Sequence, residues 1–156
     1  MAYPDLAMAY ANAQLIRSLK TTAARLREGS EYQWGHLGMC NCGQLVQTIT
    51  GEDRHEIHRA ALARGGQWDD RVREYCPDSG HSIDAIIRTL LEQGLTTGDL
   101  ADLEGLSDDR ILRRLPSGRR YLERNQREDV IEYLETWATL LDEQLQARVE
   151  AAGHAA

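Results

Sequence analysis

Thiol and imidazole side chains are concentrated in one part of this 156-residue chain. All three cysteines and four of the five histidines lie between residues 36 and 81. Thiolates and imidazoles are the ligands that zinc prefers, and they also bind iron. We therefore expect a transition-metal site, holding zinc or iron, with five candidate ligands. They are His36, Cys40, Cys42, Cys76 and His81.

The spacing of these residues groups the ligands into two clusters. Residues 36–42 contain a His-x3-Cys-x-Cys pattern, and residues 76–81 contain a Cys-x4-His pattern. Together they offer three thiolates and two imidazoles, which is enough for a tetrahedral site. The Cys-x-Cys pair chelates less well than the wider cysteine spacing of structural zinc sites. Since the chain has only three cysteines, one chain cannot form an all-cysteine site.

Two other interpretations of the cysteines remain open at this stage. Cysteine is among the most buried residue types, and Cys42 shares a helical face with the apolar residues that follow it, so the pair can be core residues. Alternatively, Asn41 caps a helix, and the positive end of the helix dipole stabilises a thiolate at Cys40 or Cys42. Thiol redox chemistry would then use these cysteines, with His36 as the base.

A carboxylate–histidine pair offers a weaker metal pattern. Glu52 and His55 have the Glu-x2-His spacing of one half of a carboxylate-bridged di-iron site, and His58 follows one turn later. The chain contains no second Glu-x2-His pattern. A helix face exposed to solvent is therefore the simpler interpretation of these residues.

The elements that position these side chains are predicted to be helices. Apolar residues recur at intervals of three and four, and no segment alternates as a strand does. The pattern predicts an all-α fold, a single-domain helical bundle over residues 1–156 with long N- and C-terminal helices and several short helices between them. The predicted segments are an N-terminal helix 5–28, a Cys/His-rich segment 30–82, a helical hairpin 83–115 and a C-terminal helix 127–150.

Part of the helical hairpin resembles a bacterial helix-turn-helix over about twenty residues, 95–115. Its second helix, over residues 107–115, would then lie in the DNA groove. Asp108 and Asp109 at the start of that helix would repel phosphates, so DNA binding is an alternative that we do not favour. The arginines that would contact DNA are Arg110, Arg113, Arg114, Arg119 and Arg120.

The charge and hydropathy of the whole chain narrow the function classes further. The net charge of −7 is unlike that of a general nucleic-acid binder, which needs clustered lysine and arginine. No apolar run approaches the roughly 18 residues of a membrane-spanning helix, and no secretory signal pattern is present at the start. We therefore expect a cytoplasmic protein with reduced thiols and no membrane association.

The two terminal helices suggest a third class of function. Both have long apolar stripes, and Trp137 in the C-terminal helix could anchor an interface. We expect a homo-oligomer that assembles through these helices. The protein would then be a non-catalytic helical interaction protein, in contrast to a metal or thiol protein or a DNA-binding regulator. The sequence assigns no catalytic residue and names no substrate.

Overall fold

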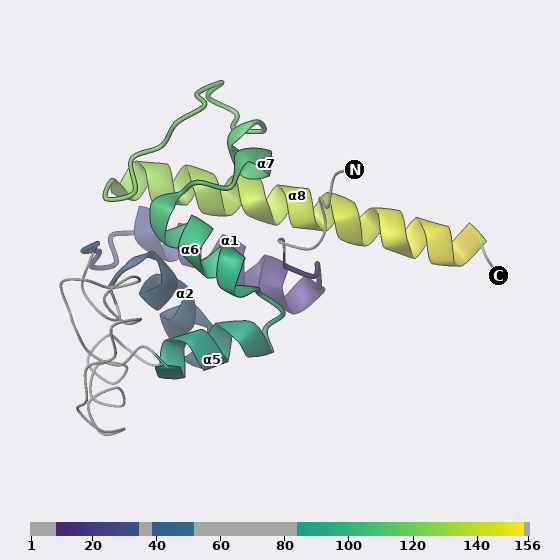
Figure 1. Cartoon of the computed structure of the whole chain (residues 1–156), viewed down its shortest axis with the longest axis horizontal. Coiled ribbons are helices and arrows are strands. Elements are labelled where there is room, and N and C mark those ends of the chain that lie inside the picture. Colours follow the sequence, from purple (N-terminus) through teal and green to yellow (C-terminus); the bar gives the residue numbers. More distant parts are fainter. Residues whose placement is uncertain (1–8, 35–38, 52–83, 155–156) are drawn as a thin grey trace.

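The computed structural model describes residues 9–34, 39–51 and 84–154, with no side-chain description for residues 84–86 and 154. Every regular element in these ranges is an α-helix, which confirms the predicted all-α fold. Figure 1 shows the helices gathered around a central core, with the C-terminal helix extending beyond it. The helices are α1 (Ala13–Arg27), α2 (Asn41–Thr50), α5 (Asp84–Glu92), α6 (Thr97–Gly105), α7 (Asp109–Leu112) and α8 (Arg127–His154).

The two terminal helices, α1 and α8, pack side by side (Figure 1). Their buried residues follow helical spacing, so each helix turns one apolar stripe toward the other. Burying a large apolar side chain contributes about 1.5–3 kcal/mol, and this pairing therefore supplies much of the folding free energy. The stripe of α8 consists of Val130, Leu134, Trp137, Ala138 and Leu141, each no more than 1% exposed.

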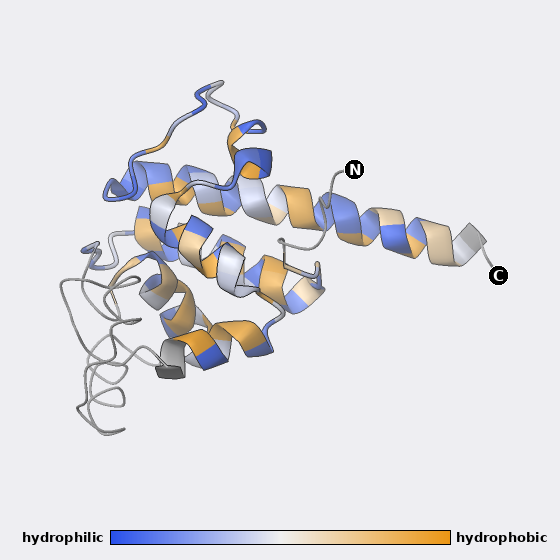
Figure 2. Ribbon diagram, viewed as in Figure 1, coloured by the Kyte–Doolittle hydropathy of each residue, from blue (hydrophilic) through white to orange (hydrophobic). Residues whose placement is uncertain are grey.

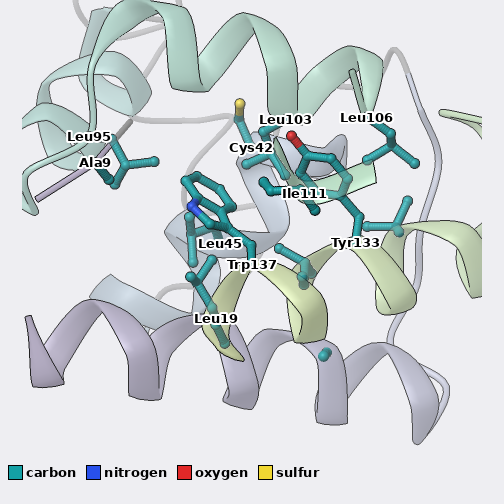
Figure 3. Packing of buried hydrophobic residues seen from close by; sticks show 14 of the residues in the cluster. Ala9, Leu19, Cys42, Leu45, Leu95, Leu103, Leu106, Ile111, Tyr133 and Trp137 are labelled. Atoms are coloured by element: carbon teal, nitrogen blue, oxygen red, sulfur yellow. The ribbon is translucent and has the colours of Figure 1, made fainter. Parts of the chain in front are cut away.

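The shorter helices complete the core on the other side of α1. Helix α2 contacts α1, α5 and α6, and α7 lies against α8 (Figure 1). Figure 3 shows that Trp137 of α8 reaches toward Leu45 of α2, so the layers share one cluster of buried residues. Figure 2 shows apolar residues on α2, α5 and α6, whereas the loop between α7 and α8 is mainly hydrophilic.

Helix α1 begins later than the sequence predicted. The prediction placed its start at residue 5, but the backbone of Asn12 is extended, and the helix begins at Ala13. Asn12 caps the helix by accepting a hydrogen bond from Leu15 N at 2.8 Å, and its amide donates to Gln93 O at 3.2 Å. Gln93 directly follows α5, so this contact joins two distant parts of the chain. It holds Asn12 in the capping position and thereby sets the start of α1.

The predicted cap of α2 is wrong by one residue, because Cys40 rather than Asn41 caps the helix. Thr96 caps α6, and Asp108 caps α7. Each of these three caps has extended backbone, and its side chain accepts a hydrogen bond from the first turn, which is the role of an N-cap.

The last helix agrees with its prediction at the start and is longer at the end. It begins at Arg127 as expected, but it continues to His154, beyond the predicted end at residue 150. Leu141 is its last fully buried residue, and Leu145 packs partly buried against the core. Arg148 contacts the ring of Tyr10, and Val149 is 59% exposed, so the last turns of α8 extend beyond the core (Figure 1).

Candidate functional site

Cys40 and Cys42 lie together at the N-terminus of α2. Cys40 is the N-cap, and its Sγ accepts a hydrogen bond from Gly43 N at 3.3 Å. Cys42 lies in the first turn, and its Sγ is 3.6 Å from Leu100 O of α6. Both are thiols rather than disulfide sulfurs, and they are 3% and 7% exposed. The positive end of the α2 dipole therefore faces two buried thiols.

A buried carboxylate from α6 meets this helix end. Glu104 is 7% exposed, and its Oε1 accepts a hydrogen bond from Cys42 N at 2.6 Å. The thiols of Cys40 and Cys42 also hydrogen-bond to this carboxylate. Burial raises the pKa of Glu104, and the hydrogen bonds from Cys42, Cys40 and the Asn41 amide oppose that rise.

Asn41 locks α2 to the end of α6. Its side chain is fully buried, and its amide nitrogen donates to Leu103 O at 3.0 Å and Glu104 O at 3.2 Å. Its Oδ1 is 2.7 Å from the Tyr32 hydroxyl, which also lies 2.6 Å from Arg124 O. Burial, followed by the charge of Glu104, raises the pKa of Tyr32, so the phenol stays protonated.

Trp34, in the loop before α2, also contacts the end of α6. Its indole nitrogen donates to Glu104 O at 3.1 Å, and the guanidinium of Arg124 lies 4.3 Å from the centre of its ring. The cation and the ring attract each other, which holds the Arg124 loop against this segment.

The structure brings together two of the five predicted metal ligands, Cys40 and Cys42. The other three, His36, Cys76 and His81, lie outside the described residues. Within the described ranges, no group of three or more His, Cys, Asp or Glu side chains could hold a metal ion. The described residues therefore supply only part of the predicted site. The Glu52, His55 and His58 pattern likewise lies outside them.

Sequence reasoning missed Glu104. A glutamate in the last turn of a helix faces the negative end of its dipole, and this mismatch is the signal that could have singled it out. The structure resolves the mismatch, because the carboxylate reaches instead to the positive N-terminus of α2. Only the packing of α6 on α2 reveals that partner.

The arginines of the helix-turn-helix prediction are mostly engaged within the chain. Arg110 pairs with Asp108, and Arg113 pairs with Asp109. Arg114 makes two 2.7 Å contacts with Glu143 of α8, and Arg119 bridges Asp129 and Glu132. Arg120 is exposed. Four of the five side chains are therefore neutralised by carboxylates of the same protein.

The predicted recognition helix is also too short. The sequence suggested a helix over residues 107–115, but α7 spans only Asp109–Leu112, a single turn. Residues 113–126 continue as a loop (Figure 1). Leu115 and Leu122 are buried in it, and Arg114 and Arg119 pair with carboxylates of α8. A single turn that begins with two aspartates presents little surface to a DNA groove.

Trp137 does not have the exposed position that an interface anchor needs. It is 1% exposed and stacks edge-on against Tyr133, with ring centroids 6.1 Å apart (Figure 3). The apolar stripe to which it belongs faces α1 of the same chain. The expectation that Trp137 anchors a partner is wrong in this structure, because the intramolecular core already covers it.

A groove of about 530 Å³ runs along α8. Its lining includes Ile131 and Thr136 of α8 together with Pro116 of the preceding loop. An ion pair between Arg27 of α1 and Glu135 of α8 also lies in this lining. We call the region around the two thiols the cysteine corner; it consists of Trp34, Cys40, Asn41, Cys42 and Glu104. None of these residues lines the groove, so the groove and the thiols are separate features.

Comparisons with family models, with curated proteins and with solved structures found no match to this chain. Within the described ranges, none of the helices combines the length and the hydropathy that a bilayer crossing requires.

Proposed function

We propose that this protein binds a transition metal, zinc in first place, through the thiolates of Cys40 and Cys42. The remaining ligands would come from His36, Cys76 and His81, as the spacing in the sequence suggests. The observation that carries this proposal is the convergence of two thiols and a carboxylate at one buried helix N-terminus. The role of the metal would be structural, tying the Cys/His-rich segment to the helical core.

The charge balance of this corner supports a cation. Glu104 is buried, and no described lysine, arginine or histidine forms an ion pair with it. An uncompensated buried charge is strongly destabilising, and a carboxylate in this position either keeps a proton or acquires a cationic partner. A metal ion bound by the adjacent thiolates would supply the missing positive charge.

The helix end supports thiolate formation. Metal ligation requires deprotonated cysteine, and a helix N-terminus lowers the free energy of a thiolate. The first turn of α2 offers its amide groups to Cys40 and to Glu104. The same backbone positions would stabilise the negative charge that metal binding develops on the sulfurs.

Thiol redox chemistry is less well supported by the same geometry. Reactive cysteines are at least partly exposed, whereas Cys40 and Cys42 are buried, and the Cys42 sulfur lies against Leu100 O of α6. DNA binding is also less well supported, because most of the arginines concerned are ion-paired within the chain.

Cys40→Ser is the variant that tests the proposal most cleanly. Serine is a strong N-cap, so this change keeps the cap of α2 while it removes one thiolate. We expect the wild type, purified without a tag and without oxygen, to contain near-stoichiometric metal, and the variant to lose it. In the presence of a chelator the two proteins should unfold at the same denaturant concentration. A wild type without metal would contradict the proposal.

A further inference from the structure

Helix α6 covers the thiols at the start of α2. The Cys42 sulfur lies 3.6 Å from Leu100 O, and the Glu104 carboxylate receives the Cys42 amide. Figure 1 shows α6 alongside α2, and Figure 3 shows Cys42 next to Leu103 of α6. A reagent or metal ion that reaches Cys42 from this side can do so only when α6 moves away from α2.

The first turn of α6 holds a buried aspartate. Asp99 is 2% exposed, and its Oδ2 accepts a hydrogen bond from Thr96 N at 2.7 Å. In return, Asp99 N donates to Thr96 Oγ1 at 3.1 Å, which completes a capping box. The other carboxylate oxygen, Oδ1, is buried and has no hydrogen-bond partner among the described residues.

The groups around Asp99 carry an excess of negative charge. Asp108, the cap of α7, is 6% exposed, and its carboxylate holds the guanidinium of Arg110 at 2.9 Å. Asp102 lies one turn further along α6, and Tyr133 of α8 faces all three aspartates. The carboxyl groups of Asp99, Asp102 and Asp108 therefore all interact with a single positive charge, the guanidinium of Arg110.

The other neighbours of α6 among the described residues do not offset this charge. Helix α2 contributes only one titratable side chain, the thiol of Cys42. The described charged residues of α5, Arg88 and Glu92, are exposed to solvent. The pKa of Asp99 is raised to about 6, mainly by burial and also by the charge of Asp108, while Thr96 and Arg110 act in the opposite direction.

We propose that α6 is a proton-linked cover over Cys40 and Cys42, which is closed firmly when the Asp99 carboxyl is neutral and loosened when it is charged. The significance of this regulation rests on the proposed function, because it controls access to the same thiols. When α6 detaches, Asp99 returns to water and regains the pKa of an ordinary aspartate, 3.8. Opening therefore becomes easier as the pH rises through about 6.

The rate at which a maleimide labels Cys40 and Cys42 measures this opening. It would be followed in the full chain with a chelator present, at about pH 5 and about pH 8, for the wild type and Asp99→Asn. The ratio of the two rates at each pH removes the ionisation of the thiol itself. A pKa difference of roughly two units corresponds to a change of up to about a hundredfold in opening. We expect the wild-type to variant ratio to rise at least about tenfold between the two pH values.

Asp109→Asn is the matched control, since Asp109 is an exposed aspartate at the start of α7. The wild-type to Asp109→Asn ratio should stay constant with pH. A constant ratio for Asp99→Asn, or the same change in both variants, would overturn the inference. Hydrogen exchange of the α6 amides in the wild type provides a second measurement, and protection that does not fall with rising pH would also overturn it. Because thiol labelling is read without metal, this result is independent of whether metal binds.

Discussion

At the scale of single residues, the cysteine corner depends on Asn41 as much as on the cysteines. The sequence predicted that Asn41 would cap α2, but the cap is Cys40 and Asn41 is a buried bridge to the end of α6. The local sequence pattern cannot distinguish a cap from a buried bridge, because in both roles the asparagine side chain stands at the start of a helix. The distinguishing partners, Leu103 O and Glu104 O, are more than sixty residues away in the chain.

Asn41→Asp is the substitution that tests this bridge. The new carboxylate would lie against the two carbonyl oxygens that now accept hydrogen bonds and beside Glu104. We expect a loss of about 2–3 kcal/mol in the free energy of unfolding at neutral pH, with part of it recovered in acid as the carboxyl protonates. Denaturant titration at the two pH values measures it.

Asn41→Ala provides the control for that experiment. It removes the same hydrogen bonds without adding a charge, so its loss of stability should be nearly independent of pH. Identical pH profiles for the two variants would show that Asn41 does not face the α6 carbonyls.

At the scale of elements, helical periodicity predicted α1, α2, α5, α6 and α8 at close to their observed positions. The errors lie at the ends, where Asn12, Thr96 and Asp108 are caps because of their backbone conformation and tertiary partners. The recognition helix was also wrong in length, because the apolar spacing of residues 107–115 continues past the point where α7 ends. Leu106, at a φ of 50°, sets the turn between α6 and α7.

The capping box of α6 gives a prediction about stability and pH. The pKa of Asp99 is raised by burial to about 6, so in the folded state this group stays neutral to a higher pH than in the unfolded chain. Its contribution to stability is fully present below the ordinary aspartate pKa and is lost as the pH rises through about 6. Asp99→Asn should remove this loss, and we expect the variant to gain about 1–2 kcal/mol relative to the wild type between pH 4 and pH 8.

Thermal unfolding of both proteins across that pH range measures the difference. Asp109→Asn again serves as the control, because its carboxylate is exposed and should leave the pH profile of the wild type unchanged. A difference between wild type and Asp99→Asn that is independent of pH would contradict the raised pKa.

At the scale of the whole molecule, the pairing of α1 with α8 is the main support of the fold. The sequence predicted both helices and their apolar stripes, and the structure shows that the two helices pack on each other within the chain. The prediction that the same helices bind a second copy through Trp137 is not compatible with the burial of that residue. An apolar stripe on a predicted helix indicates that this face will be buried. It does not indicate whether the helix that buries it belongs to the same chain or to a second copy.

Trp137→Ala separates the two possibilities. Truncating this buried side chain leaves a cavity, and we expect a loss of about 3–5 kcal/mol in unfolding free energy. The change should leave the oligomeric state of the folded fraction unaltered in sedimentation experiments. Trp137→Leu, which leaves a smaller cavity, should lose less stability and provides a folded sample. A dimer lost without a loss of stability would show that Trp137 lies in an interface.

The proposed metal site is tested most directly by elemental analysis of the protein purified without a tag and without oxygen, beside Cys40→Ser. We expect near-stoichiometric zinc or iron in the wild type and its loss from a variant that keeps the α2 cap and folds equally well in chelator. A metal-free wild type, or metal retained by Cys40→Ser, would contradict it.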